Sequence, residues 1–313
     1  MEEFLGIVKE SFSELQDYRR EEGQRHSLNN LIIISVCAII ANADSEKDIA
    51  EYAAAKQDWL ETFLVMKHGT PSTSTIKRFF EFIDPKQFAI CFSNVVKKLP
   101  IKKFGKHIAL DGKTLRSSYD KVNGVLSTHI VNAMETEHGI TLAQVRTETK
   151  SNEITAIPQI INLINIEKAV VTIDAMGCQK AIAELILERK GEYLLALKSN
   201  HPKLHVEVVN LFDKAKEQQE YRYKRTIDKG HGRIEEREYF TLSSEKISLH
   251  ERCQWSGIKS IVCTTTKRQE VSTGKTSLET RYYISSLDFE EIDKISSSIR
   301  RHWGIENSLH YVS

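Results

Sequence analysis

Three carboxylates stand in settings that suit them to hold divalent metal ions. Asp111 and Asp174 each follow a short apolar run of the kind that forms a buried strand, and Glu306 lies in a basic stretch with helical character. Magnesium and manganese prefer carboxylate oxygens as ligands, and acids that converge from different elements can hold two such ions. The pattern therefore predicts a site for two divalent metal ions, which would carry out phosphoryl transfer on nucleic acid.

Each acid also has an ordinary structural interpretation. An aspartate at the end of a strand is as often a helix cap or a turn former. A glutamate on a late helix is exposed to solvent more often than it is a ligand. From the residue types alone, both interpretations of Asp111, Asp174 and Glu306 stay open.

Basic side chains near these acids in the sequence are candidates for contacts with DNA phosphates. Those next to Asp111 could equally be solvated loop charges, and those around Gly232 could belong to a plain hairpin turn. Trp303 could stack on a flipped base, although core packing is the simpler expectation. The candidate DNA-binding residues are Lys113, Arg116, Lys198, His231, Arg233, Arg300, Arg301 and His302.

The composition is that of a soluble globular protein, since 40% of the 313 residues are hydrophobic and 28% are charged. A net charge of +1 means that any DNA-binding surface must be local. Five cysteines without C-x-x-C spacing argue against a zinc site and a disulfide framework, and they fit the cytoplasm. The longest apolar run, residues 31–41, is shorter than the roughly 20 residues of a membrane-spanning helix, so we expect no membrane partner.

Residues 1–100 have the pattern of a helical domain, with apolar residues at helical spacing. The third expected helix carries Lys77 and Arg78 and resembles helix-turn-helix chemistry in outline only, so we expect a packed all-helical domain. The expected helices run over about 28–41 with Ser27 as cap, across 49–60 with Ser45 as cap, over 75–83 with Ser74 as cap, and onward from Pro85.

From about residue 101 strands and helices alternate, which is typical of an α/β fold with a mixed sheet. Residues about 200–285 interrupt this order and predict a β-rich insertion, and a last helix at about 289–309 carries Glu306. Before the insertion, the expected elements are a strand at 108–110, a hairpin over 124–147, a helix that follows Pro158 and ends near Leu163, a strand ending at Ile173, a helix at 179–190 and a strand at 191–198. Within it, we expect a charged helix at 203–219 and strands at 234–242, 258–265 and 277–285.

A series of motifs in fixed order resembles one known family. The series begins with Asp111-Gly-Lys-Thr-Leu-Arg and ends with His302-Trp-Gly-Ile-Glu-Asn-Ser-Leu-His. It is similar to the H-repeat-associated (ISAs-type) transposases of bacterial insertion sequences, which are members of the DDE superfamily. The likeness runs from about residue 15 to the end. The intervening motifs fall at 150–158, 173–179, 197–200, 231–237 and 281–286.

The resemblance implies a fold, an activity and a set of ligands. It implies an RNase H-like core over residues 101–313 with a β insertion, after a helical domain over 1–100 that binds DNA ends. Asp111, Asp174 and Glu306 would be the DDE ligands of two Mg²⁺ (or Mn²⁺) ions. The implied activity is metal-dependent cleavage at the ends of the element, followed by strand transfer into target DNA. The implied partner is double-stranded DNA, bound at the terminal inverted repeats and at the target by a homo-oligomer.

The sequence departs from the wider superfamily in two respects. The Tyr, Arg and Lys of the superfamily motif around the glutamate are replaced here by Ile299, His302 and Ser313. The family also continues well beyond this glutamate, so we expect a catalytic domain that is C-terminally truncated relative to the family. An alternative function is therefore a catalytically inactive, truncated transposase that acts only as a DNA-binding protein. A third is a hydrolytic nuclease on the same core.

Overall fold

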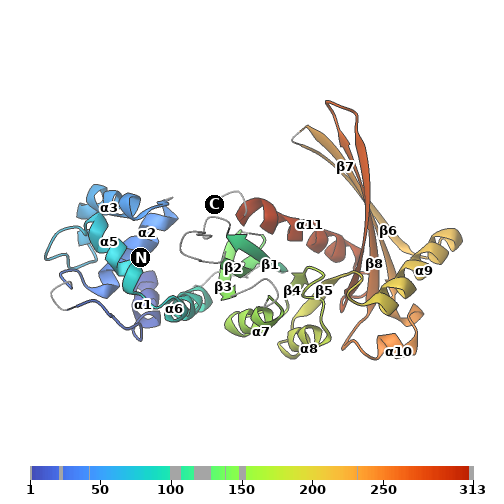
Figure 1. The fold of residues 1–313 in the computed structure, drawn as a ribbon, viewed down its shortest axis with the longest axis horizontal. Coiled ribbons are helices and arrows are strands. Elements are labelled where there is room, and N and C mark those ends of the chain that lie inside the picture. Colours follow the sequence, from blue (N-terminus) through green and yellow to red (C-terminus); the bar gives the residue numbers. More distant parts are fainter. Residues whose placement is uncertain are drawn as a thin grey trace, which may run out of the picture. The chain divides into compact units, whose positions relative to one another are not determined.

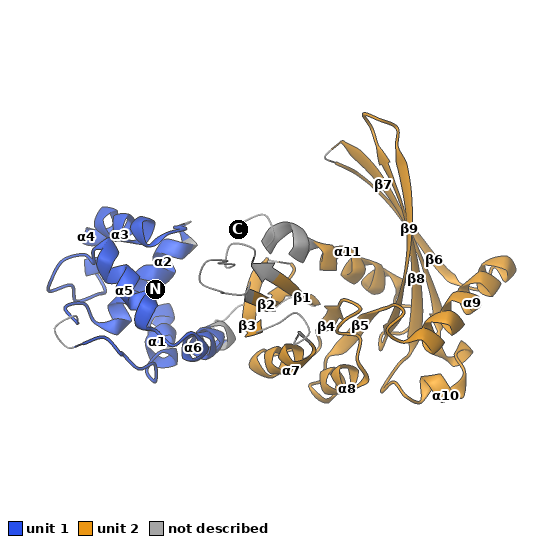
Figure 2. Ribbon diagram, in the orientation of Figure 1, with its two compact units in different colours: residues 1–100 blue, residues 101–313 orange. Residues whose placement is uncertain are grey.

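The computed structural model describes residues 2–20, 24–41, 43–98, 107–115, 128–137, 139–147, 153–230 and 232–309. Within these ranges, the side chains of residues 2, 40, 96–97, 114–115, 128, 153 and 304–309 are not described. The chain divides into two compact units, residues 1–100 and residues 101–313 (Figure 2). None of the helices in the described ranges has the length and apolarity that crossing a bilayer requires.

The first unit is helical, as the sequence predicted. Its core gathers around α2, where the run Leu31–Ile34 is fully buried. Burial of this apolar run contributes to the unit's stability. Its helices are α1 (Glu2–Ser11), α2 (Leu28–Ile40), α3 (Glu46–Ala55), α4 (Gln57–Glu61), α5 (Thr73–Phe82) and α6 (Pro85–Lys98).

The helix caps confirm two predictions and correct a third. Ser27 caps α2 and Ser45 caps α3, each by accepting a hydrogen bond from the amide three residues later. The cap of α5 is Ser72, whose hydroxyl accepts from the amide of Thr75 at 3.3 Å, and not Ser74. A run of serines and threonines offers several caps, and the residue that follows Pro71 in an extended conformation is the one used.

The described strands of the second unit form one nine-stranded mixed sheet in the order β3-β2-β1-β4-β5-β9-β8-β7-β6 (Figure 1). Its strands are β1 (His107–Leu115), β2 (Thr128–Glu135), β3 (Ile140–Thr147), β4 (Val170–Ile173), β5 (Glu192–Leu197), β6 (Arg222–Gly230), β7 (Arg233–Ser243), β8 (Ser260–Glu270) and β9 (Thr276–Ser285). Its helices are α7 (Glu153–Leu163), α8 (Lys180–Glu188), α9 (Pro202–Gln218), α10 (Leu249–Arg252) and α11 (Ile292–Leu309), with a short 3-10 turn at Ser244–Lys246.

The first five strands confirm the predicted α/β core. The strand pairs β1–β2 and β2–β3 are antiparallel, whereas β1–β4 and β4–β5 are parallel. Helices α7 and α8 pack on one face of this part of the sheet and α11 packs on the other (Figure 1). Both faces of β4 are therefore covered, and all four of its residues are buried.

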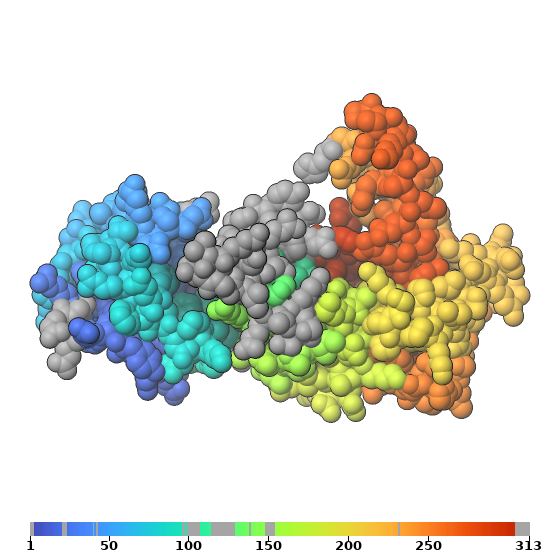
Figure 3. All heavy atoms as spheres, in the orientation of Figure 1, coloured from blue at the N-terminus to red at the C-terminus, as the bar shows by residue number. Residues whose placement is uncertain are grey.

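The predicted β-rich insertion extends the same sheet. β9 pairs antiparallel with β5, and β8, β7 and β6 follow outward. Val170 and Leu194 of the core strands share one hydrophobic cluster with Tyr239 and Val262 of the insertion, beneath α11. The distal ends of β8 and β9 stand out from their unit as a ridge (Figure 3), and residues 276–280 of β9 are exposed.

Candidate active site

Asp111 and Asp174 are brought together by the register of two parallel strands. The paired residues of β1 and β4 end at Leu110 and Ile173, so the two aspartates are the next residue on each chain. Because side chains alternate along a strand, both occupy the face that carries Ala109 and Thr172, which is the face covered by α11. The convergence of these two acids, expected from the sequence, is thus a property of the sheet.

The two aspartates differ in their surroundings. β1 does not end before Asp111, as the sequence suggested, but continues to Leu115 in its pairing with β2, where Asp111 lies opposite Asn132. Asp111 is therefore half-buried within a strand, whereas Asp174 is exposed at the end of one. The pairing of β1 with β4 ends just before the two aspartates, so both lie at the end of this strand pair.

Asp174 also shapes its own loop. One of its carboxylate oxygens, Oδ1, accepts hydrogen bonds from the amides of Met176 at 3.1 Å and Gly177 at 3.3 Å. The ordinary interpretation of a turn-forming aspartate is therefore correct for this residue. It does not exclude metal binding, because a carboxylate carries two oxygens with several acceptor positions.

The loop after β5 holds the loop after β4 in place. The side-chain amide of Asn200 donates to the carbonyl of Ala175 at 2.7 Å, and His201 Nε2 donates to the carbonyl of Cys178 at 2.6 Å. Neither residue was a predicted site residue, although both belong to the 197–202 stretch that includes one of the family motifs. Lys198, a predicted DNA contact, is exposed at the start of this loop.

Buried polar side chains lie directly behind the aspartates on the α11 face. His302 Nδ1 and His107 Nε2 both lie 2.9 Å from the hydroxyl oxygen of Thr172. His107 Nδ1 lies 2.7 Å from the hydroxyl oxygen of Thr136. A polar threonine two residues before Asp174, inside an apolar run, was the signal in the sequence that could have pointed to this cluster.

Both imidazoles are neutral near pH 7. Burial lowers the pKa of His107 to about 3, and the charges of His302 and Arg301 act in the same direction. Burial lowers the pKa of His302 to about 4, with Asp174 opposing the shift and Arg281 adding to it. The contact of His302 with Thr172, two residues before Asp174, shows that this part of α11 lies close to Asp174.

Glu306 lies within α11, one helical turn beyond His302, but its side chain is outside the part of the chain that the structure describes. Among the described side chains, no group of three or more His, Cys, Asp or Glu residues lies close enough to hold a metal ion. The donors that do converge are the carboxylates of Asp111 and Asp174, and such oxygens fit magnesium or manganese.

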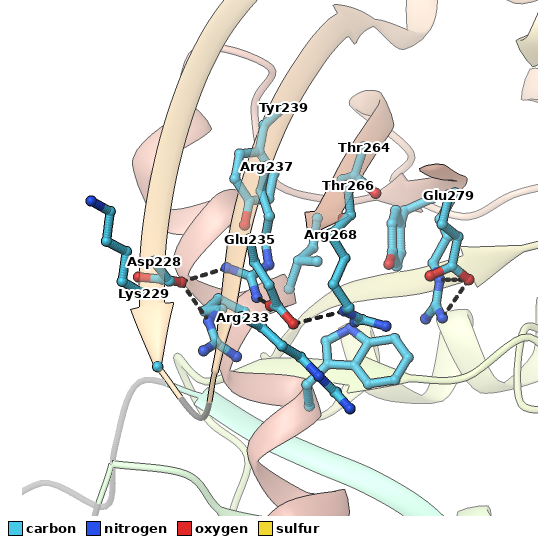
Figure 4. Close-up of a pocket in the computed structure, with 16 residues that line it drawn as sticks. Asp228, Lys229, Arg233, Glu235, Arg237, Tyr239, Thr264, Thr266, Arg268 and Glu279 are labelled. Atoms are coloured by element: carbon cyan, nitrogen blue, oxygen red, sulfur yellow. Dashed lines mark hydrogen bonds and ion pairs between the residues drawn. The ribbon is translucent and has the colours of Figure 1, made fainter. Parts of the chain in front are cut away.

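A groove of about 1090 Å³ lies between the insertion strands and α11 (Figure 4). Its described lining includes six basic side chains and three acidic ones, so the groove favours anions. The acids bridge the strands: Asp228 pairs with Arg237 and with Arg300, and Glu235 pairs with Arg237 and Arg268. The basic residues are Lys229, Arg233, Arg237, Arg268, Arg281 and Arg300, and the acidic residues are Asp228, Glu235 and Glu279.

The predicted DNA-binding residues fall in different places. Arg233 and Arg300 line the groove, and so does Trp303, whose ring centroid lies 4.0 Å from the guanidinium carbon of Arg281. Lys113 on β1 and Arg301 on α11 are half-buried. Arg116 and His231 lie outside the described residues. The DNA contacts of all these residues stay predictions.

Comparisons with known proteins identify related sequences over nearly the whole chain. The model of the family "Transposase DDE domain" matches residues 102–312, and the model "DDE_Tnp_1-associated" matches residues 9–96. The chain is 36% identical to the putative transposase YncI of Escherichia coli O157:H7 over 306 residues, which are 96% of this chain and 77% of that protein. It is 34% identical to the H repeat-associated putative transposase YhhI of Escherichia coli strain K12 over 310 residues, which are 98% of this chain and 82% of that protein.

Proposed function

The chain belongs to the family of DDE transposases, and we propose that it cleaves DNA at the ends of its own element and joins the freed 3′ ends to target DNA. The observation that carries this proposal is the register of β1 and β4, which places Asp111 and Asp174 side by side. Helix α11 supports it, because this helix crosses the same face and includes Glu306.

We assign metal binding to Asp111, Asp174 and Glu306. Two bound Mg²⁺ or Mn²⁺ ions would supply activation of the attacking hydroxyl and stabilisation of the leaving oxygen. The carboxylates hold the ions and do not themselves relay protons. The rigid sheet fixes the backbone positions of Asp111 and Asp174, and a metal site needs ligands that are held in place by rigid elements.

DNA binding is assigned to two regions. The groove beside α11, with Arg233 and Arg300, would contact the phosphate backbone near the acids, since arginines on a rigid surface suit phosphates. Recognition of the terminal repeats belongs to the helical unit, where α5 exposes Lys77 and Arg78. Assembly as a homo-oligomer on DNA is part of the same proposal, since two element ends must be processed together.

The proposal is tested by incubating the purified protein with Mg²⁺ or Mn²⁺ and labelled DNA that carries the ends of its element. The variants are Asp111→Ala and Asp174→Ala, and the matched control is Asp213→Ala, which removes an exposed aspartate from α9. We expect metal-dependent cleavage and joining by the wild type and the control. The two site variants should lose both reactions by more than about 1000-fold while still binding DNA.

Other results of this experiment would overturn the assignment of the acids or identify a different function. Joining by the Asp111→Ala protein would overturn the assignment of the acids. Cleavage without joining would identify a hydrolytic nuclease. Repeat-specific DNA binding by the wild type, without cleavage, would favour a protein that only binds DNA.

A further inference from the structure

Helix α11 presents one stripe of positions to the sheet. Positions 295, 299, 302 and 306 are separated by four, three and four residues, so they follow one another along one helix face. The isoleucines at 295 and 299 are buried in a cluster that includes Val170 of β4. His302 is hydrogen-bonded to Thr172, two residues further along β4. The stripe therefore advances along β4 towards Asp174.

Position 306 and Asp174 both lie just beyond the contact between His302 and Thr172. Position 306 is four residues, or about 6 Å, further along α11, and Asp174 follows Thr172 by two residues, or about 6.6 Å of extended chain. The contact therefore joins the helix to the strand close to Asp174 and one helical turn before position 306.

Other contacts of α11 are less directional or more exposed. They include the stacking of Arg281 on β9 over the ring of Trp303. The packing of Ile295 and Ile299 is apolar and has no directional preference. The ion pairs Lys224–Asp293 at 2.6 Å and Arg300–Asp228 at 3.3 Å tie α11 to β6, but their side chains are a third or more exposed to solvent, and exposed ion pairs contribute little to stability. The hydrogen bond from α11 to Thr172 is directional, and Thr172 itself is 3% exposed.

Thr172 is also held from its other side. Its hydroxyl lies 2.9 Å from His107 Nε2, and His107 Nδ1 lies 2.7 Å from the hydroxyl of Thr136. A hydroxyl has one proton and two lone pairs, so Thr172 can bond both imidazoles at once, either by accepting from the N–H of each or by donating to one and accepting from the other. Thr172 therefore lies between the two imidazole rings, and His302 makes its hydrogen bond within the protein.

We propose that His302 is a positioning residue, which through Thr172 sets the register of α11 so that Glu306 reaches the Asp111–Asp174 pair. This inference rests on the proposed function of the three acids. It replaces the predicted DNA contact of His302 with a contact to the sheet. It also gives a role to the histidine that stands where the wider superfamily has an arginine.

The test compares Thr172→Val, which removes the hydroxyl at nearly constant shape, with Thr172→Ser, which retains it. Thr241→Val is the matched control, because Thr241 is also buried in this sheet and donates to a carbonyl, that of Phe289, at 2.6 Å. The measurements are Mn²⁺ affinity by titration, the cleavage rate at saturating DNA, the Kd for DNA, and the thermal unfolding midpoint. Asp174→Ala gives the baseline for Mn²⁺ binding.

We expect Thr172→Val to weaken Mn²⁺ binding and to slow cleavage, each by about 10- to 100-fold, as is typical when a partner of a metal ligand is removed. The Kd for DNA should stay within about twofold of the wild type, and Thr172→Ser should restore both properties. Thr241→Val should lower the unfolding midpoint without either effect. Because Mn²⁺ affinity is measured without DNA, the positioning role can fail or succeed independently of whether the wild type cleaves.

Three results would overturn the inference. The first is wild-type Mn²⁺ affinity in folded Thr172→Val protein. The second is an equal loss of Mn²⁺ affinity in Thr241→Val. The third comes from His302→Asn, which keeps a polar group near the position of Nδ1. A DNA Kd weakened more than tenfold in that variant, with unchanged Mn²⁺ affinity, would return His302 to the DNA interface. If Thr172→Val does not fold, His302→Leu takes its place, because it removes the other partner of the same hydrogen bond. It should show the same loss of Mn²⁺ affinity, and wild-type affinity in folded His302→Leu protein would overturn the inference.

Discussion

At the scale of single residues, His107 should contribute strongly to the pH dependence of stability between pH 6.5 and 3, together with His302, whose pKa is lowered to about 4. Its side chain is buried, and burial lowers its pKa to about 3, whereas a histidine in the unfolded chain has a pKa of about 6.5. In this window the unfolded state binds a proton that the folded state does not bind. The free energy of unfolding therefore falls as the pH falls.

The expected size follows from about 1.4 kcal/mol for each pH unit. Between pH 6.5 and pH 4.5 the wild type should lose roughly 2–3 kcal/mol through this residue, as measured by urea unfolding at both pH values. His107→Gln should be less stable at pH 6.5 but should lose less stability on acidification. His250→Gln is the control, because the side chain of His250 is 80% exposed. Equal pH slopes in His107→Gln and the wild type would contradict the prediction.

Gly177 is required by the close packing of the loop that follows β4. A Cβ atom at this position would collide with Cγ2 of Ile173 and would lie 2.8 Å from Cδ1 of Ile157. Gly177→Ala should therefore lower the free energy of unfolding by about 1–3 kcal/mol through overpacking. Gly230→Ala is the matched control, since a Cβ atom there meets nothing within 4 Å. Denaturant unfolding of the two variants checks the difference, and equal stability would refute the steric argument.

The sequence predicted some features of the site and not others, for a physical reason. The proximity of Asp111 and Asp174 was predictable, because apolar runs mark the strands and parallel strands end at one edge of a sheet. The direction of His302 was not, because the rotation of α11 depends on how Ile295 and Ile299 pack against residues of other elements, such as Val170 and Leu194, which are far away in the chain. Periodicity shows which residues of a helix share an apolar face, but it does not show which element that face packs against.

At the scale of elements, hydrogen bonds of a buried serine hydroxyl support the pairing of β5 with β9. Ser285 Oγ donates to the carbonyl of Tyr193 at 2.7 Å and accepts from the amide of Leu287 at 3.0 Å. Ser285→Ala should lower the free energy of unfolding by about 1–3 kcal/mol, because it leaves these buried backbone groups without the hydroxyl. Ser277→Ala, at an exposed position of β9, should change it by less than about 0.5 kcal/mol. Similar values in denaturant unfolding would show that the hydroxyl does not support the joint.

The elements that the sequence missed or misplaced share an explanation. β6 was not expected, because it is an edge strand with mostly exposed polar residues and so lacks the alternation that marks a half-buried strand. α7 begins at Glu153 and contains Pro158, whereas the sequence suggested that the helix would follow this proline. In both cases contacts with neighbouring elements determine the secondary structure. β6 is stabilised by pairing with β7, and α7 is stabilised by packing against β2 and β3.

At the scale of the whole molecule, the chain consists of two units that each have a core of their own. The first unit has a buried cluster around α2 and α5, and the second has clusters around its sheet. Stability is therefore expected to be set separately in each unit. The change from helical spacing to alternating strands and helices near residue 101 already suggested this division in the sequence.

Phe79→Ala tests whether the units are independent. Phe79 on α5 is 2% exposed, and removing its ring should destabilise the first unit by about 3–5 kcal/mol. Hydrogen exchange on the full chain should then show lost protection in α2, α3 and α5, with β4 and β5 unchanged. Phe82→Ala is the control on the same helix, since Phe82 is 49% exposed and its loss should leave protection nearly as it was. Lost protection in β4 and β5 of the Phe79→Ala protein would mean that the two units unfold as one, because only a shared cooperative transition would carry a defect in the helical core into the sheet.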